Sequence, residues 1–255
     1  MIKAVFLDID GTIYVPGEPG IRSSVLREIR RAQQKGVKVF IASGRPSSAI
    51  PAFLNEVHAD GFILSNGAQL RIGSMNLNRF LPEEAIRKAA EMLDAEKIPY
   101  SIQTETVTYN VRDMLDYYAL YGIHTEEFDG DPKKYGRTLK IEFKLRPEEV
   151  NRIAGYPKAL GLEYRPDGTS MEFNDPGCSK GKALAKAAEL LGIRIEETAA
   201  FGDAVNDIEM IRAAGTGVAM ANAKEDVRAA ANLIAPDVRA DGVAVMLQRL
   251  MEEKE

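Results

Sequence analysis

Five short apolar runs limit what this chain can fold into more than any other feature of its sequence. They occupy positions 4–7, 37–41, 61–64, 199–201 and 217–220. Each run is almost continuously apolar, whereas a strand with one solvent-facing side alternates apolar and polar residues. Continuous runs of this kind are typical of parallel strands that are covered on both faces. The pattern therefore predicts a parallel sheet with helices on both sides.

Helical patterns separate these runs. The first helix is expected to begin near Ser23 and Ser24, whose hydroxyls suit a cap, and to end at Gly36. Further helices are expected near 47–57, 179–191, 205–214 and 224–231. Strand, helix and strand in succession form a βαβ unit, so the sequence predicts an α/β fold.

The length of the chain, 255 residues, exceeds the roughly 100 to 150 residues of a common single domain. Between about 80 and 175 the pattern changes to helices interleaved with alternating stretches at 106–111 and 138–144. A hairpin is expected to turn at Asp167-Gly168. We therefore expect a core domain of residues 1–80 and 176–255, with an α+β domain of residues 81–175 inserted into it.

Composition removes several classes of function. The formal net charge of −5 and the lack of a Lys/Arg cluster argue against nucleic-acid binding. The only cysteine, Cys178, excludes an intramolecular disulfide and favours a reducing compartment, for which we expect the cytoplasm. The first apolar run reaches Asp8 too soon for a signal peptide or a membrane span, so no membrane association is expected. With only two histidines, His58 and His124, the chemistry is expected to depend on carboxylates.

Four of the predicted strands end in residues suited to a site, because ligands of open parallel sheets bind outside the carboxyl ends of the strands. The four strand ends are Asp8-Ile9-Asp10-Gly11-Thr12, Ala42-Ser43-Gly44-Arg45, Ser65-Asn66-Gly67 and Gly202-Asp203-Ala204-Val205-Asn206-Asp207.

Asp8 and Asp10 are separated by one residue at a strand end, so both side chains can point to one side, and Gly11 lets the backbone turn. One carboxylate can attack phosphorus while the other transfers the proton of the leaving group. The alternative is that both acids only cap a turn and a helix.

Asp203, Asn206 and Asp207 provide further oxygen ligands after a second strand. A hard divalent cation is held in proteins by one or two carboxylates and retained waters, and Mg²⁺ fits this set. The alternative is an acidic helix N-terminus stabilised by the helix dipole. That alternative does not explain Asp203 together with Asp8.

Ser43 and Gly44 can hold a phosphoryl oxygen with a hydroxyl and unhindered backbone N–H groups. No histidine lies near Ser43 in sequence, so a serine nucleophile is disfavoured. Lys180 opens a predicted helix, where its charge opposes the helix dipole, and it can neutralise both the phosphate and the nucleophile. The alternatives are a capping serine and a solvated surface lysine.

Taken together, these segments resemble the haloacid dehalogenase superfamily, and within it the Cof-type sugar-phosphatase-like group with a type IIB (C2B) cap. The four family motifs occur in order as Asp8-Ile9-Asp10-Gly11-Thr12, Ser43-Gly44-Arg45, Lys180-Gly181 and Gly202-Asp203-Ala204-Val205-Asn206-Asp207. The resemblance covers essentially the whole chain and implies a Rossmann-like core with an inserted cap. Ser43 stands where many relatives have threonine, a change that keeps the hydroxyl.

The resemblance also implies roles for individual residues. Asp8 is expected to be the nucleophile and Asp10 the general acid and base, with Asp8, the Asp10 carbonyl and Asp203 binding Mg²⁺. The phosphoryl group is expected to be bound by Ser43 and Lys180. Further phosphate contacts are expected from Gly11, Gly44, Arg45 and Asn206. Support for Lys180 or the metal is expected from Asn206 and Asp207. The rim that faces the cap is expected to contain Asn66 and Gly67.

The sequence thus predicts a Mg²⁺-dependent phosphatase that forms an aspartyl-phosphate on Asp8. Sugar phosphates lead as substrates on the family resemblance, followed by pyridoxal phosphate and flavin mononucleotide. The alternatives are a phosphosugar mutase, a phosphoacceptor signalling protein and a catalytically silent metabolite-binding protein. A monomer or weak homodimer is expected. Candidate substrate contacts in the inserted domain are Tyr109, Arg112, Lys140, Glu142 and Asn174.

Overall fold

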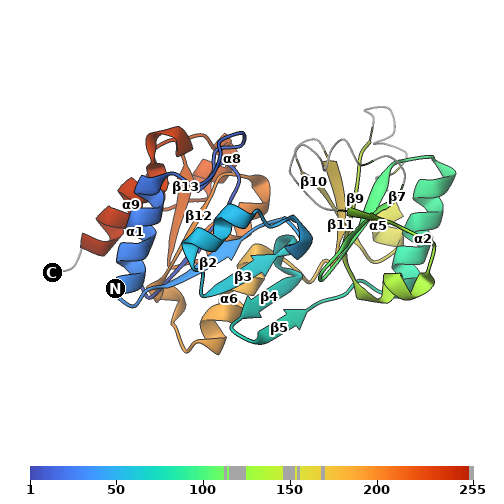
Figure 1. The fold of residues 1–255 in the computed structure, drawn as a ribbon, viewed down its shortest axis with the longest axis horizontal. Helices are drawn as coiled ribbons and strands as arrows, with labels where there is room; N and C mark the ends of the chain where they lie inside the picture. The colour runs from blue at the N-terminus through green and yellow to red at the C-terminus, as the bar shows by residue number, and fades with distance from the viewer. Residues whose placement is uncertain (112–113, 115–124, 146–152, 154–155, 168–169, 253–255) are drawn as a thin grey trace. The chain divides into compact units, whose positions relative to one another are not determined.

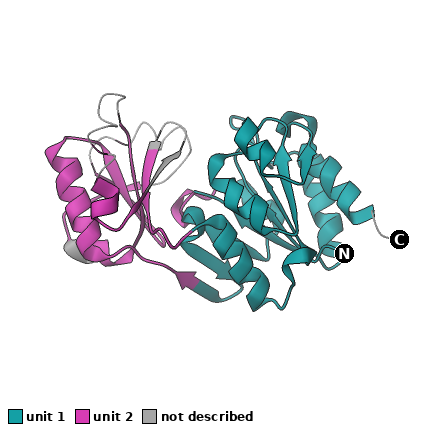
Figure 2. Ribbon diagram, turned by 180° about the vertical axis from the view of Figure 1, so that it is seen from behind, with its two compact units in different colours: residues 1–44, 52–76, 179–255 teal, residues 45–51, 77–178 magenta. Residues whose placement is uncertain are grey.

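The computed structural model describes residues 1–111, 114, 125–145, 153, 156–167 and 170–252. The chain divides into two compact units (Figure 2). Unit 1 comprises Met1–Gly44, Ala52–Asn76 and Ser179–Glu255, and unit 2 comprises Arg45–Pro51 and Leu77–Cys178. The domain boundaries expected from the sequence, after residues 80 and 175, stay a prediction.

Unit 1 is built on an eight-stranded sheet. The chain passes from unit 1 to unit 2 within its last strand, β5. Along the sheet the strands are β14 (Leu233–Ala235), β13 (Thr216–Met220), β12 (Thr198–Gly202), β1 (Ala4–Leu7), β2 (Lys38–Ala42), β3 (Gly61–Leu64), β4 (Gln69–Ile72) and β5 (Met75–Asn78). The pairs from β14 to β3 are parallel, and β4 is antiparallel to β3. All five predicted strands are present, and their apolar residues are buried except for Phe62, which is half-buried.

Two pairs of helices cover this sheet (Figure 1). Helix α1 (Ser23–Gln34) packs against α9 (Gly242–Glu252), and α6 (Lys180–Leu190) packs against α7 (Ile208–Ala213). The short helix α8 (Glu225–Ala229) contacts β13. Phe6 and Phe40, from neighbouring strands, stack with ring centroids 4.8 Å apart on the side of α6 and α7. The central strands β1 and β12 are therefore buried on both faces, as continuous apolar strands require.

Two local predictions for unit 1 and its neighbouring segment are wrong in detail. The helix expected near 47–57 is replaced by two 3₁₀ segments, η1 (Ser47–Ala49) and η2 (Ala52–Val57). Pro51 explains the break, because proline lacks an N–H and forces Ile50 into extended backbone, with φ −78° and ψ 115°. Helix α1 begins at Ser23, and its N-cap is Arg22 with no side-chain capping bond, so neither serine caps it.

Unit 2 is a six-stranded sheet with helices on one face. The strand order is β10 (Glu163–Asp167), β11 (Ser170–Asn174), β9 (Thr138–Phe143), β6 (Tyr100–Thr104), β7 (Thr108–Val111) and β8 (Thr125–Glu127). Helix α2 (Glu83–Ala95) packs its apolar side on Ile102, Ile141 and Phe173; the unit also contains η4 (Pro132–Arg137) and α5 (Tyr156–Ala159). The predicted hairpin is β10–β11, although residues 168–169 of its turn lie outside the described residues.

Successive strand residues point to opposite sides, so the polar residues of these strands share the opposite face of the sheet. These polar side chains are buried. Lys140, Glu142 and Asn174 lie on this face, and Lys140 forms an ion pair with Glu172. Tyr109 is half-buried against the apolar cluster, and Arg112 lies outside the described residues.

The fold is therefore a Rossmann-like α/β core with an inserted α+β cap, as predicted. Within the described part of the chain, no helix has both the length and the apolar character needed to cross a bilayer.

Candidate active site

The order of strands in the unit 1 sheet brings the predicted motifs together. Strands β12, β1, β2 and β3 are consecutive neighbours and parallel, so their carboxyl ends lie along one edge. These ends are followed by Asp203, Asp8, Ser43 and Ser65 respectively. Residues that are up to about two hundred positions apart in sequence thus become neighbours because of the sheet topology alone.

Lys180 lies at the centre of the site, at the first residue of α6. Its Nζ is 2.7 Å from Asp8 Oδ1 and 2.7 Å from Asp207 Oδ1. The lysine is fully buried, as is Asp207, and Asp8 is 6% exposed. The other oxygen of Asp207, Oδ2, accepts the N–H groups of Asp203 and Ala204, each at 3.0 Å. Asp207 therefore fixes both the ammonium group and the loop that carries Asp203.

The Asp203 carboxylate is held against the first motif. Thr12 Oγ1 donates to Asp203 Oδ1 at 2.9 Å. Gly11 has φ +84°, and a Cβ at this position would lie 2.3 Å from Asp203 Oδ2. Glycine is required here both for its backbone conformation and for the close approach of the carboxylate.

Burial and mutual repulsion of the carboxylates perturb their protonation. Burial, followed by the charge of Asp207, raises the pKa of Asp8 well above its ordinary value, although Lys180 opposes this. The same two causes raise the pKa of Asp203 to about 6, against the lowering effect of the Thr12 hydrogen bond. Burial alone would lower the pKa of Lys180, but the charges of Asp207 and Asp8 outweigh it and raise that pKa.

These features fit a divalent cation. Ligand oxygens of Asp8, Asp203 and Asp207 all lie within 4.8 Å of one another. When all three are ionised they exceed the single positive charge of Lys180 by two negative charges, an excess that a divalent cation would neutralise. Because Asp207 already binds Lys180 and two amides, Asp8 and Asp203 are the better ligands.

Asp10 is half-buried in the turn after β1. It pairs with Tyr14, and the Gly11 N–H donates to the Tyr14 carbonyl at 2.9 Å. The peptide bond is trans, so the Asp10 carbonyl points to the side opposite the Gly11 N–H and away from Tyr14. The contribution of this carbonyl to metal binding stays a prediction.

The second motif is joined to the fourth by a pair of amides. Asn206 Nδ2 donates to Asn66 Oδ1 at 3.0 Å, and the Asn66 N–H donates to the Ser43 carbonyl at 3.2 Å. A Cβ on Gly44 would lie 3.0 Å from Asn66 Oδ1. The amide of Asn206 thus contacts Asn66, while Asp207 is the residue that contacts Lys180.

Two further predicted residues have distinct positions. Gly67, with φ +94°, packs directly on the carbonyl of Ser179, which a Cβ would approach to 2.3 Å. It therefore supports the start of α6, where the Ser179 side chain accepts the Lys182 N–H and caps the helix. Arg45 belongs to unit 2, and its Nη1 donates to the Ala49 carbonyl at 3.1 Å.

Asn222 is a contact of the site that the sequence reasoning missed. It lies just after β13, the next strand beyond β12, and its Nδ2 donates to the Gly11 carbonyl at 2.9 Å. The same nitrogen is 3.5 Å from Asp203 Oδ2. A polar residue after the apolar run at 217–220 is a signal of the same kind as the polar residues at the other four strand ends.

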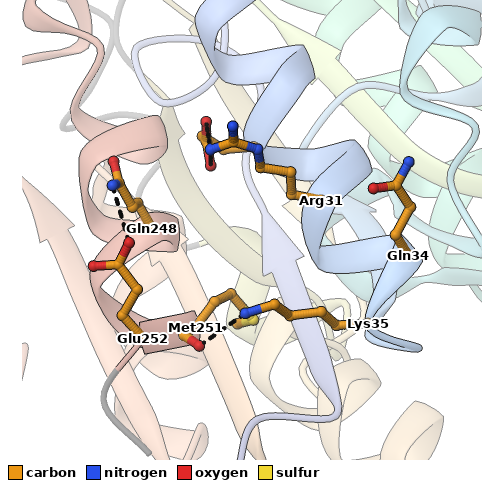
Figure 3. Close-up of a pocket in the computed structure, with 7 residues that line it drawn as sticks. Arg31, Gln34, Lys35, Gln248, Met251 and Glu252 are labelled. Atoms are coloured by element: carbon orange, nitrogen blue, oxygen red, sulfur yellow. Dashed lines mark hydrogen bonds and ion pairs between the residues drawn. The ribbon is translucent and has the colours of Figure 1, made fainter. Parts of the chain in front are cut away.

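A separate groove of about 370 Å³ lies between α1 and α9 (Figure 3). Its lining residues come from these two helices and from Lys35, which follows α1, and include none of the predicted site residues. Lys35 Nζ donates to the Met251 carbonyl there, and Arg31 pairs with Glu28.

The chain is similar to known hydrolases over most of its length. Residues 5–247 match the family of haloacid dehalogenase-like hydrolases. The Bacillus subtilis protein YkrA is 32% identical, over 97% of this chain and 97% of its own. A phosphoglycolate phosphatase of Methanospirillum hungatei is 28% identical, over 89% of this chain and 88% of its own.

Solved structures show the same relationship. The structure of the sugar phosphatase BT4131, of haloacid dehalogenase subclass IIB, superposes with a TM-score of 0.87 at 29% identity and covers 98% of this chain and 99% of its own. A match of the whole chain in sequence and in fold establishes the family. The chain belongs to the haloacid dehalogenase-like hydrolases, and within them to the Cof-type phosphatases.

Proposed function

We propose that this protein is a Mg²⁺-dependent phosphatase of small phosphorylated metabolites that forms an aspartyl-phosphate on Asp8. The observation that carries the proposal is the position of Lys180 Nζ, 2.7 Å from both Asp8 and Asp207 inside a cluster of three carboxylates. Phosphoryl transfer requires chiefly positioning and charge neutralisation, and this cluster provides a nucleophile, a fixed cation and metal ligands within a few ångströms.

Asp8 is the nucleophile in this proposal. Lys180 holds Asp8 Oδ1, which fixes the carboxylate plane and favours its ionised form. Asp8 and Asp203 would hold the metal, which when bound supplies positive charge to the transferring phosphoryl group. Attack of an Asp8 oxygen forms the new P–O bond as the bond to the substrate alcohol breaks, and Lys180 remains beside the developing charge.

Asp10 transfers the protons. It would protonate the departing alkoxide in the first step and remove a proton from the water that hydrolyses the aspartyl-phosphate in the second. Ser43 and the backbone at Gly44 would bind phosphoryl oxygens, with Asn206 and Asn66 orienting that loop. This assignment is supported by the way in which Asn66 joins the Ser43 carbonyl to the fourth motif.

Sugar phosphates are the proposed substrates. The supporting observations are the similarity to the sugar phosphatase BT4131 and to a Bacillus subtilis phosphatase of 5-amino-6-(5-phospho-D-ribitylamino)uracil, which is 28% identical over 95% of this chain. The leaving groups of both are hydroxyl-bearing. Unit 2 would exclude bulk water and select among such leaving groups.

The experiment replaces Asp8 by asparagine and measures hydrolysis of an aryl phosphate in Mg²⁺ buffer. Loss of the nucleophile should lower kcat by at least about 10³-fold, because the covalent intermediate can no longer form. Acid quenching of wild-type turnover, followed by peptide mass spectrometry, should place a phosphoryl adduct on the peptide that contains Asp8.

The matched control is Asp60→Asn, which removes a carboxylate from the same unit where it pairs with Lys38 at the surface. This variant should retain wild-type turnover. Turnover by Asp8→Asn close to that of the control, or an adduct on another residue, would reject Asp8 as the nucleophile.

A further inference from the structure

We infer that Asn222 is a positioning residue for the metal site: its side-chain amide sets the Gly11 turn and the Asp203 carboxylate in the arrangement that binds the cation. The inference rests on the proposed function, because it assumes that Asp203 is a metal ligand. It concerns a residue outside the four family motifs, and it derives from contacts within unit 1 alone.

The Asn222 side chain connects three separate segments. Its Oδ1 accepts the Val238 N–H at 2.9 Å, and its Nδ2 donates to the Gly11 carbonyl at 2.9 Å. Because a backbone N–H can only donate, the bond from Val238 fixes which end of the amide is the oxygen. The nitrogen therefore faces Gly11 and Asp203, where both neighbours are acceptors.

This placement restrains both the backbone turn at Gly11 and the carboxylate of Asp203. Gly11 has the left-handed φ of +84°, and the Asn222 bond fixes the peptide on its carboxyl side, while the bond from the Gly11 N–H to Tyr14 fixes the peptide on its amino side. Thr12 donates to one oxygen of Asp203, and Asn222 Nδ2 lies 3.5 Å from the other. The carboxylate is thus approached by donors on both oxygens.

The chemistry of the amide suits this role. A lysine at position 222 would add a positive charge beside the cation, and an acid would place a further negative charge beside Asp203. An amide can orient the carboxylate without a charge, and outer-shell groups that do so change metal affinity by about 10- to 100-fold when they are removed.

A purely structural role predicts something different. Asn232 provides the comparison, because it is also an exposed asparagine of unit 1 whose Oδ1 accepts a backbone N–H, that of Gly217, at 2.7 Å. Among the described residues, the hydrogen bonds of Asn232 are with Gly217, and none joins it to Asp203 or Gly11. If Asn222 only braced a loop, its loss would resemble the loss of Asn232.

The test is titration calorimetry of Mg²⁺ alone, without substrate, into wild type, Asn222→Ala and Asn232→Ala. Both side chains are exposed, so both variants should fold, which far-ultraviolet circular dichroism checks. We expect Asn222→Ala to raise the Kd for Mg²⁺ about tenfold and Asn232→Ala to leave it within about twofold. Activity assays should show the matching rise in the Mg²⁺ concentration that gives half-maximal rate, with kcat largely restored at saturating Mg²⁺.

Equal Mg²⁺ affinities in wild type and Asn222→Ala would overturn the role of Asn222 while leaving the proposed function intact. Equal losses of affinity in the two alanine variants would also overturn it, since they would reflect general loosening of the unit. A wild-type chain that takes up no Mg²⁺ would instead overturn the metal dependence of the proposed function, and the role of Asn222 with it.

Discussion

Replacing Asp203 by asparagine should stabilise the metal-free protein at neutral pH, even though it removes a metal ligand. Asparagine keeps the size of the side chain and an oxygen that can accept the Thr12 hydroxyl. It removes the negative charge that burial and Asp207 make unfavourable. The perturbation thus separates the stability of the fold from the requirements of the reaction.

The magnitude follows from the two pKa values. The pKa of Asp203 is raised from 3.8 to about 6 in the folded protein, and one unit corresponds to about 1.36 kcal/mol, so the ionised carboxylate costs up to about 3 kcal/mol. Part of this gain is lost because the amide nitrogen of the variant would face Asn222 Nδ2, which now lies 3.5 Å from Asp203 Oδ2. We expect a net stabilisation of about 1 to 3 kcal/mol.

The difference in stability between the variant and the wild type depends on pH. Well below about pH 4 the carboxyl group is protonated in both the folded and the unfolded state, so the stabilisation from removing its charge disappears and the variant should be no more stable than the wild type. Between about pH 4 and pH 6 the folded wild type binds more protons than the unfolded chain, and its stability falls as the pH rises. Above about pH 6 the full difference should be present.

Binding of Mg²⁺ should remove or reverse this difference in stability. A ligand that binds only the folded state at 100 times its Kd adds about 2.7 kcal/mol, and the wild type should gain this where the variant gains little. The metal-free variant should therefore be the more stable protein in chelator, and the wild type should reach or exceed it in saturating Mg²⁺.

Thermal unfolding followed by far-ultraviolet circular dichroism is the assay, because the chain contains no tryptophan. For a protein of this size, 1 to 3 kcal/mol corresponds to a change in Tm of roughly 2 to 12 °C. The control is Asp60→Asn, which should show no effect of Mg²⁺ on its offset from wild type. Destabilisation of metal-free Asp203→Asn at pH 8, or an offset that is the same at pH 4 and pH 8, would show that the ionised Asp203 carboxylate does not destabilise the fold.

Three further predictions address the rest of the site. Lys180→Met should destabilise the protein by about 3 to 5 kcal/mol in urea unfolding, because it leaves Asp8 and Asp207 buried without their cation; an unchanged midpoint would contradict the central ion pairs. Gly11→Ala should weaken Mg²⁺ binding in calorimetry by at least about tenfold, since its Cβ would overlap Asp203, and unchanged affinity would show that the turn is not restrained as described. With a hexose 1-phosphate, nuclear magnetic resonance of the products should show inorganic phosphate, whereas hexose 6-phosphate would indicate the mutase.

The architecture of unit 1 could be predicted from its sequence because it depends on local patterns. Continuous apolar runs specify strands that are buried on both faces, and short connections through helices make them parallel. Once the strands are parallel, the residues after β1, β2 and β12 lie at the same edge, and the strand order makes them neighbours there. Proline at position 51 shows the limit of this reasoning: its effect on the segment 47–57 is local, yet the helical periodicity there concealed it.

Strand periodicity and chain order thus predict that Asp8, Ser43 and Asp203 lie along one edge of the sheet. How these residues pair depends on the three-dimensional fold, in which Lys180 bridges Asp8 and Asp207, and Asn222 reaches Gly11 from the loop after β13, two strands away from β1. Which side chains come within hydrogen-bonding distance depends on loop conformation and helix placement to within an ångström, and these are set by packing between segments that are distant in the chain.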